Sequence, residues 1–209
     1  MDLRRVIHNN ESSFLILKDG VPCYMAQQIP DDSVYYMLSP GNNTLFPVSN
    51  FRVNPNTHLI WTMRPGNRTG NMWFGVDNSD DNTDFRIGCP AGWNFSFVDI
   101  GSNRGNLYYT IGGSNSDLKM TVEQYNHGVR ITDGDTGAAI ASADFTKVSS
   151  YSYGDVGLFS VPNFKIYDCK IVDDVQGTVF DAVVTADGLY DKVSQQIIPL
   201  SGWTVVKEQ

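Results

Sequence analysis

Short apolar segments follow one another along the whole chain, and residues that favour turns separate them. Phe14–Leu17 ends at Lys18-Asp19-Gly20, and Val34–Leu38 is followed by Pro40-Gly41. In Leu118–Val122, apolar residues alternate with polar ones, as in a strand with one buried face. Such segments recur roughly every ten residues, a spacing typical of β-sandwiches. In Phe164–Val172, regular alternation places Ile166 on the same face as Asp168 and Lys170. Further predicted strands are Phe46–Val53, His58–Met63 and Thr178–Val184. The pattern therefore excludes helical bundles and coiled coils.

Composition favours the same fold class. Hydrophobic residues make up 41% of the 209 residues, which is enough to build a core, whereas charged residues make up only 18%. No segment of helical length is amphipathic with a helical period, and no linker or internal repeat interrupts the chain. We therefore predict an all-β protein built as one compact antiparallel β-sandwich, a jelly roll.

The charge distribution excludes several partners. The chain has 15 basic and 23 acidic residues and a net charge of −8, and Arg4-Arg5 is its only adjacent basic pair. Nucleic acids and anionic membrane surfaces are bound by clustered Lys and Arg, so neither is expected as a partner. No apolar run is long enough for membrane insertion. Because no apolar stretch follows the N-terminal arginines, we expect no signal peptide and synthesis in a cytoplasm.

The cysteines and histidines are scattered, which argues against disulfides and zinc. The three cysteines form no CxxC motif, so we expect free thiols, mostly buried. The histidines do not show the spacing of zinc ligands. The residues concerned are Cys23, Cys89, Cys169, His8, His58 and His127.

Glycosidase chemistry is not expected. Retaining enzymes need two carboxylates about 5–5.5 Å apart, commonly supplied by one strand. The only glutamates are Glu11, Glu123 and Glu208, and no two of them can share a strand. Asp133 and Asp135 flank a glycine, which indicates a turn. We therefore predict a noncatalytic protein.

One acidic segment is a candidate calcium site. Asp77, Asp80, Asp81 and Asp84 lie within eight residues together with two asparagines, and hard oxygen ligands from a loop suit Ca²⁺. The alternative is a solvated acidic loop at the edge of the sandwich. Asp133 and Asp135 are weaker candidates of the same kind, so Ca²⁺ is the only cofactor considered.

Several aromatic residues beside polar loops could form a platform for carbohydrate. Tyr151 and Tyr153 could equally contact another subunit, because tyrosine is enriched at interfaces. Trp61 and Trp73 lie in apolar strands and are expected in the core. The carbohydrate-binding candidates are Trp93, Tyr108, Tyr125, Tyr151 and Tyr153.

The C-terminal third resembles a known family. Asn163–Ile171 looks like the "G-[KR]-I-Y-x-[FC]-K-I-Y" strand of laminin-G-like domains, and Asp187–Val193 is close to their "G-L-Y-D-K-V" motif. Trp73–Val76 is similar to their "F-G-x-R" strand. Taken together, the matches run from about Phe14 to Trp203. The chain thus resembles the concanavalin A-like lectin/glucanase superfamily, in the version found in bacteriophage virion and tail proteins and in gut bacteria.

The resemblance implies a function, and a departure from it implies a division of the chain. It implies a capsid- or tail-attached virion protein, whose partners are other virion proteins, copies of itself and host surface glycans. The family's opening motif is absent before Asp32, so residues 1–32 are a possible docking region and residues 33–209 the laminin-G-like domain. The alternatives are a carbohydrate-binding module or lectin of a gut bacterium and, less favoured, a glycoside hydrolase. The Asp187–Val193 motif itself is expected to close the fold.

Overall fold

A computed structural model describes most of the strands and turns of the chain. Side chains are described for residues 33–38, 54–65, 117–125, 128–144, 165–200 and 202–209, and the backbone alone for residues 4–8, 11–18, 21–26, 44–45, 72–76, 85–89, 94–95, 97–100, 103–105, 109–110 and 157–159. The chain divides into two compact units, Met1–Val34 and Tyr35–Gln209. Among the described residues no helix could cross a membrane.

The first unit contains a three-stranded antiparallel meander. Its order is β1-β2-β3, with β2 in the middle. The turn predicted at Lys18-Asp19-Gly20 lies between two paired strands, because Lys18 is opposite Val21. The strands are β1 (Arg4–His8), β2 (Glu11–Lys18) and β3 (Val21–Ala26).

The larger sheet of the second unit is antiparallel and carries most of the described side chains. Its main path begins at β15 and ends at β20. Outside this path, β4 pairs with β17, and β21 pairs with β4. In order, its strands are β15 (Ala139–Asp144), β14 (Gly128–Asp133), β13 (Met120–Tyr125), β6 (Thr57–Arg64), β17 (Lys165–Asp173), β18 (Gly177–Thr185), β19 (Gly188–Asp191) and β20 (Gln196–Ile198), with β4 (Tyr35–Leu38) and β21 (Thr204–Lys207).

A smaller antiparallel sheet forms the second layer. It has six strands, and a further pair, β12 and β9, forms a short ribbon. The six strands are β11 (Asn103–Gly105), β10 (Phe97–Ile100), β8 (Phe85–Cys89), β7 (Met72–Val76), β16 (Gly157–Phe159) and β5 (Thr44–Leu45); the ribbon joins β12 (Tyr109–Thr110) to β9 (Asn94–Phe95).

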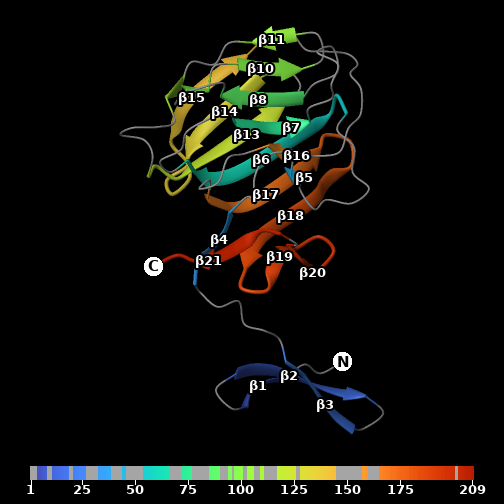
Figure 1. The fold of residues 1–209 in the computed structure, drawn as a ribbon. Helices are drawn as coiled ribbons and strands as arrows, with labels where there is room; N and C mark the ends of the chain where they lie inside the picture. The colour runs from blue at the N-terminus through green and yellow to red at the C-terminus, as the bar shows by residue number, and fades with distance from the viewer. Residues whose placement is uncertain are drawn as a thin grey trace. The chain divides into compact units, whose positions relative to one another are not determined.

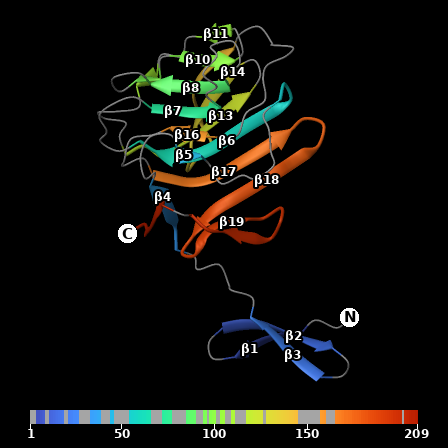
Figure 2. The same ribbon diagram turned by 45° about the vertical axis from the view of Figure 1, so that its right-hand side comes forward.

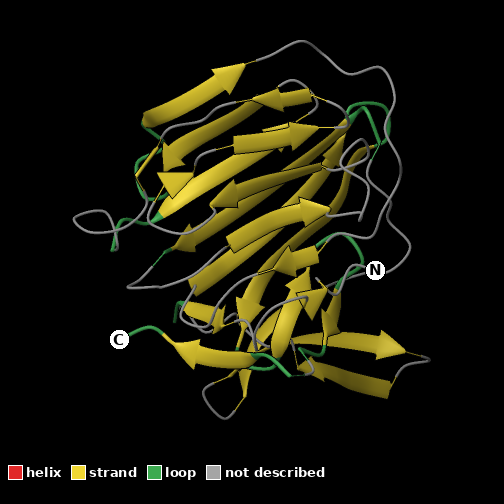
Figure 3. Ribbon diagram, turned by 45° about the horizontal axis from the view of Figure 1, so that its top comes forward, coloured by secondary structure: helices red, strands yellow, loops and turns green. Residues whose placement is uncertain are grey.

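The two sheets form a β-sandwich, as the sequence predicts. In Figure 1, β7, β8 and β10 lie in front of β6, β13 and β14, and the two layers remain distinct when the view is turned (Figure 2). The described elements are all strands (Figure 3). The chain passes from one sheet to the other between β5 and β6, between β6 and β7, and on both sides of β16. This repeated crossing is the connectivity of a jelly roll.

The inner face of the large sheet supplies a continuous apolar core. Alternate residues of β6 and β13 point inward, and their side chains are at most 1% exposed. The core includes Trp61, as the sequence predicts, and the free thiol of Cys169, whose burial raises its pKa well above the usual value. The largest buried side chains are Trp61, Tyr125, Met37, Leu59 and Met63, and all of these except Tyr125 belong to this cluster.

Strand β17 contains a β-bulge at Tyr167. Ile166 is opposite Met63 of β6, and Asp168 is opposite Thr62, the adjacent residue. Tyr167 is therefore an extra residue without a counterpart in β6. A bulge of this kind places two consecutive residues on the same face and shifts the alternation by one residue.

The bulge corrects the alternation that the sequence predicts for this strand. Regular alternation would place Ile166 on the same face as Asp168 and Lys170. In the structure, Ile166, Cys169 and Ile171 are all fully buried in one core, whereas Asp168 and Lys170 are partly exposed. The extra residue keeps apolar residues inside on both sides of the bulge and leaves a carboxylate outside.

Candidate functional site

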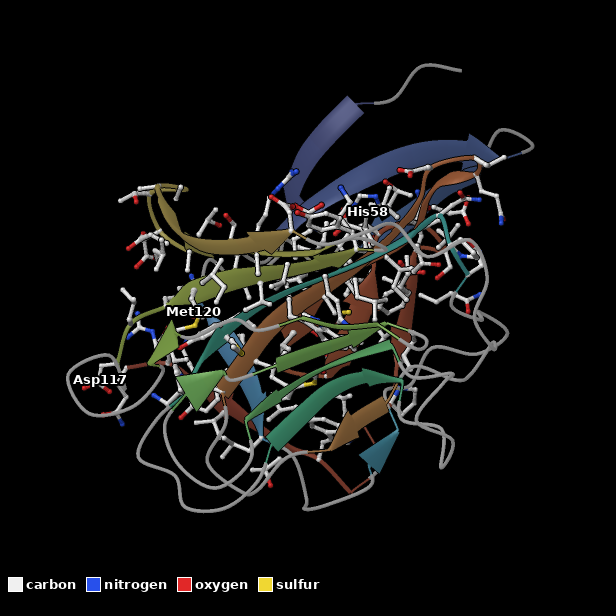
Figure 4. The ribbon with its side chains drawn as sticks, turned by 90° about the horizontal axis from the view of Figure 1, so that it is seen from above. His58, Asp117 and Met120 are labelled. Atoms are coloured by element: carbon white, nitrogen blue, oxygen red, sulfur yellow. The ribbon has the colours of Figure 1, made fainter. Side chains whose placement is uncertain are left out.

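The candidate site is the outer face of the large sheet, which is the face directed away from the smaller sheet. Figure 4 shows Met120 between the two sheets and His58 on the opposite side of the large sheet. Met120 is fully buried, while a quarter of the His58 side chain is exposed. The residues that alternate with the core positions of β6, β13, β14, β17 and β18 therefore form this outer face.

At one end of the outer face, His58 links three parts of the sheet. Its Nδ1 lies 2.8 Å from Oε1 of Glu123 on β13, and its Nε2 lies 3.1 Å from Oδ1 of Asp174 in the turn after β17. Arg130 of β14 approaches the other oxygen of Glu123 at 4.0 Å. The imidazole thus lies between two carboxylates, one on β13 and one in the turn after β17.

Tyr125 lies beside this group, and two of its members contact the tyrosine ring. The His58 ring stacks on it at 5.7 Å between centroids, and the Arg130 guanidinium lies 4.9 Å from the ring centroid. Its hydroxyl donates a 2.6 Å hydrogen bond to Oδ1 of Asp144. Burial and that bond raise the pKa of Tyr125 to about 12. With only 2% of the residue exposed, its ring is covered by protein and does not form the open carbohydrate platform that its sequence position suggested.

Tyr167 occupies a similar position near the C-terminal strand. Its hydroxyl donates a 2.6 Å hydrogen bond to Oε1 of Glu208, and its ring meets Tyr36 edge-on at 5.9 Å. Lys119 and Arg64 lie over the ring at 4.9 and 6.0 Å from its centroid. Burial and the bond to Glu208 raise the pKa of Tyr167. These contacts attach β21 to the bulge of β17.

Asp168, next in the bulge, is the carboxylate nearest the middle of the outer face. Burial raises its pKa, while hydrogen bonds from Thr62 and the nearby Lys119 and Lys192 ammonium groups lower it; burial prevails. The Thr62 hydroxyl lies 3.1 Å from that of Thr121. Among the described residues, no ion pair within 4.0 Å involves Asp168. Its charge is therefore held in a costly environment, a common property of functional residues.

Basic side chains from several strands also gather on this face. The sequence contains no basic cluster, because these residues are far apart along the chain. Most are paired with acidic groups: Lys192 lies 3.0 Å and Lys170 4.0 Å from Asp181, and Lys119 lies 3.4 Å from Asp135. Lys165 lies over the ring of Tyr36. The outer face is thus a surface of mixed charge, and only the pairing of the strands brings it together.

Three aspartates build turns. Asp133 accepts hydrogen bonds from the N–H groups of Asp135 and Thr136 and from the Thr136 hydroxyl, which lower its pKa. Asp173 and Asp191 accept equivalent bonds from residues two and three positions ahead. Asp133 thus uses its Oδ1 atom to build its turn, and Asp135 lies 3.4 Å from the Lys119 ammonium group.

The Asp187–Val193 motif closes the fold, as predicted. Leu189 is fully buried, and Asp191 accepts a further bond from the Asp181 N–H at 3.1 Å. Burial alone would raise the pKa of Asp191, but the hydrogen bonds that it accepts hold it below the usual value. The motif thus fastens β19 to β18.

The remaining sequence candidates lie outside the described residues. Among the side chains that are described, no group of three or more His, Cys, Asp or Glu could hold a metal ion. The candidates outside are the acidic residues Asp77, Asp80, Asp81 and Asp84 and the aromatic residues Trp93, Tyr108, Tyr151 and Tyr153.

Comparisons with known proteins give distant structural similarities. No family model matches the chain, and no curated protein matches it. It is similar to the binding domain of botulinum neurotoxin DC in complex with SialylT, with 12% identity and a TM-score of 0.39, and to the same domain in complex with rat synaptotagmin II, with 11% identity and a TM-score of 0.38. In both cases the alignment covers 76% of this chain and 46% of the other, so this chain spans less than half the length of these structures.

Proposed function

We propose that this chain is a noncatalytic adhesion and structural protein of a bacteriophage virion, attached to capsid or tail, and that its sandwich binds host surface glycans. The observation that carries the binding role is the outer face of the large sheet. It presents hydroxyl, carboxylate, basic and tyrosine groups from consecutive strands, held in place by contacts between strands. Polar groups fixed on rigid strands are suited to specific recognition.

The environment of the glutamates supports a noncatalytic role. Glu123 is bound to His58, and Glu208 accepts a hydrogen bond from Tyr167. Glu123 lies on β13 and Glu208 follows β21, in a different cluster, so the two do not form the closely spaced pair of a retaining glycosidase.

The virion assignment is supported by the resemblance of Asp187–Val193 and of the preceding strands to laminin-G-like domains of phage particles. Residues Met1–Val34, which include the predicted docking region 1–32, form a compact unit. In this proposal it is the part that docks onto other virion proteins or onto copies of the same chain. A unit of this size buries little apolar surface by itself, which favours such an attachment.

The full chain, labelled with a fluorophore, tests the binding role on an array of neutral, amino and acidic oligosaccharides. We expect selective binding to a small group of saccharides and no release of reducing sugar from them. Mass spectrometry of purified particles should find the chain in stoichiometric amounts. An array without any bound saccharide would contradict the adhesion role, and particles that lack the chain would contradict the virion role.

A further inference from the structure

We propose that a row of residues across the outer face, centred on Asp168, binds a neutral polyhydroxylated ligand, namely a short stretch of uncharged glycan. This inference deepens the proposed function and rests on it, because it assigns the binding role to one place on the sandwich. The row consists of Thr132, Thr121, Thr62, Asp168, Val183 and Tyr190.

The pairing of the strands places these six residues in line. Thr132 is opposite Thr121, and Thr121 is opposite Thr62. Thr62 is opposite Asp168 because the bulge at Tyr167 shifts the register. Directly opposed residues of an antiparallel sheet share a face, and neighbouring strands are about 4.8 Å apart.

The other half of the row continues in the same way. Asp168 is opposite Val183, and Val183 is opposite Tyr190. The whole row therefore crosses six adjacent strands, a length of about 24 Å at the usual strand spacing. A surface of that length accommodates several saccharide units. Except for Thr62, which is 7% exposed, all members of the row are partly exposed.

The polar groups in the middle of the row can accept hydrogen bonds from a ligand. The Thr62 and Thr121 hydroxyls lie 3.1 Å apart, and either of them can be the donor of that contact. Hydroxyl oxygens accept as well as donate, and carboxylate oxygens such as those of Asp168 accept. A ligand that hydrogen-bonds to the Asp168 carboxylate must therefore donate, as sugar hydroxyls do.

The surrounding charges select against ionic ligands. Lys119 and Lys192 lie close enough to Asp168 to lower its pKa, and they disfavour a cationic ligand. The Asp168 carboxylate in turn disfavours an anionic one. At the end of the row, Val183 and the partly exposed Tyr190 supply apolar surface for the C–H face of a sugar ring. Acceptors beside an aromatic ring, with balanced charge, favour a neutral polyhydroxylated ligand.

The test uses the full chain and the oligosaccharide array, followed by titration with the neutral oligosaccharide that binds most strongly. We expect Asp168→Asn and Tyr190→Ala to weaken binding about tenfold, and Thr121→Val about fivefold, since each removes a single contact. The matched controls are Thr178→Val, an exposed threonine of β18 outside the row, and Asp187→Asn, an exposed aspartate in the turn before β19. Both controls should bind within about twofold of the unaltered chain.

The outcomes distinguish a failure of the proposed binding site from a failure of the proposed adhesion function. Weaker binding by the row variants but not by the controls supports the site. Equal binding by all variants, with melting temperatures that show folded protein, overturns the site and leaves the adhesion role intact. Binding confined to acidic or cationic saccharides also overturns it. If the unaltered chain binds no saccharide, the proposed function fails and the site fails with it.

Discussion

At the scale of single residues, we expect Asp168 to lower the stability of the folded state while it contributes to the proposed ligand binding. A carboxylate that burial holds above its usual pKa destabilises the folded state at neutral pH, where it is ionised. Asn keeps the shape of the side chain but carries no charge. We therefore expect Asp168→Asn to melt about 2–4 °C higher at pH 7, the shift that roughly 1 kcal/mol produces in a domain of this size.

The stability gained by Asp168→Asn should depend on pH in a defined direction. The folded-state pKa of Asp168 is raised, so the penalty is fully present above that pKa and disappears as the pH falls below the unfolded value of about 3.9. Melting curves between pH 3 and pH 8 measure it. A variant that is less stable at pH 7 would show that the charge contributes favourably to the fold.

Gln195 has a left-handed backbone conformation that is strained for a residue other than glycine. It has a φ of 58°, whereas the equivalent positions in two other turns are Gly137 and Gly177, with φ of 72° and 83°. Side chains other than glycine pay about 1 kcal/mol or more in this region. Gln195→Gly should therefore raise the free energy of unfolding by about 1 kcal/mol. Denaturant titration checks this, and Gln196→Gly, one residue later in strand β20, should instead lower stability.

At the scale of elements, the turns that carry an aspartate make the sheet sensitive to acid. Asp173 accepts hydrogen bonds from the Asn54 side chain and from the N–H groups of Val175 and Gln176. Burial alone would raise its pKa, but these bonds hold it below the usual value. The stabilisation is thus present above the unfolded pKa of about 3.9 and lost as the pH falls through the lower folded pKa.

Replacement of this carboxylate tests the turn. Asp173→Ala should lose about 1–3 kcal/mol at pH 7, because charged hydrogen bonds of this kind contribute that much. The difference from the unaltered chain should shrink steadily below pH 4. Asp117→Ala, at an exposed turn position before β13, serves as the control and should change stability little. A loss for Asp173→Ala that is the same at pH 2 and pH 7 would show that the carboxylate charge is not involved.

Sequence periodicity predicted the positions of strands better than the irregularities within them. It placed strands at His58–Met63 and Thr178–Val184, and the structure has them at Thr57–Arg64 and Gly177–Thr185. The bulge at Tyr167 was missed, because alternation assumes a regular ladder and gives no signal for an extra residue. The segment Phe46–Val53, also predicted as a strand, lies outside the described residues.

The candidate site was beyond the reach of periodicity for a different reason. The Thr62 and Thr121 hydroxyls meet across 59 residues of sequence, and His58 meets Glu123 across 65. Such contacts follow from which strands are neighbours, and a pattern within one segment does not specify its neighbours. Tyr125 shows the converse: its place beside a polar loop suggested exposure, but residues of two other strands cover its ring.

At the scale of the whole molecule, the Tyr35–Gln209 unit begins and ends on adjacent strands. β4 and β21 are paired antiparallel, and Tyr35 is directly opposite Lys207. A force that separates the two ends of this unit therefore acts on their hydrogen bonds one after another, beginning at that pair. The strands would open like a zipper at low load. Because the far end of β4 is also paired with β17, through Met37 and Leu38, the load reaches the interior of the sheet only as the opening approaches those residues.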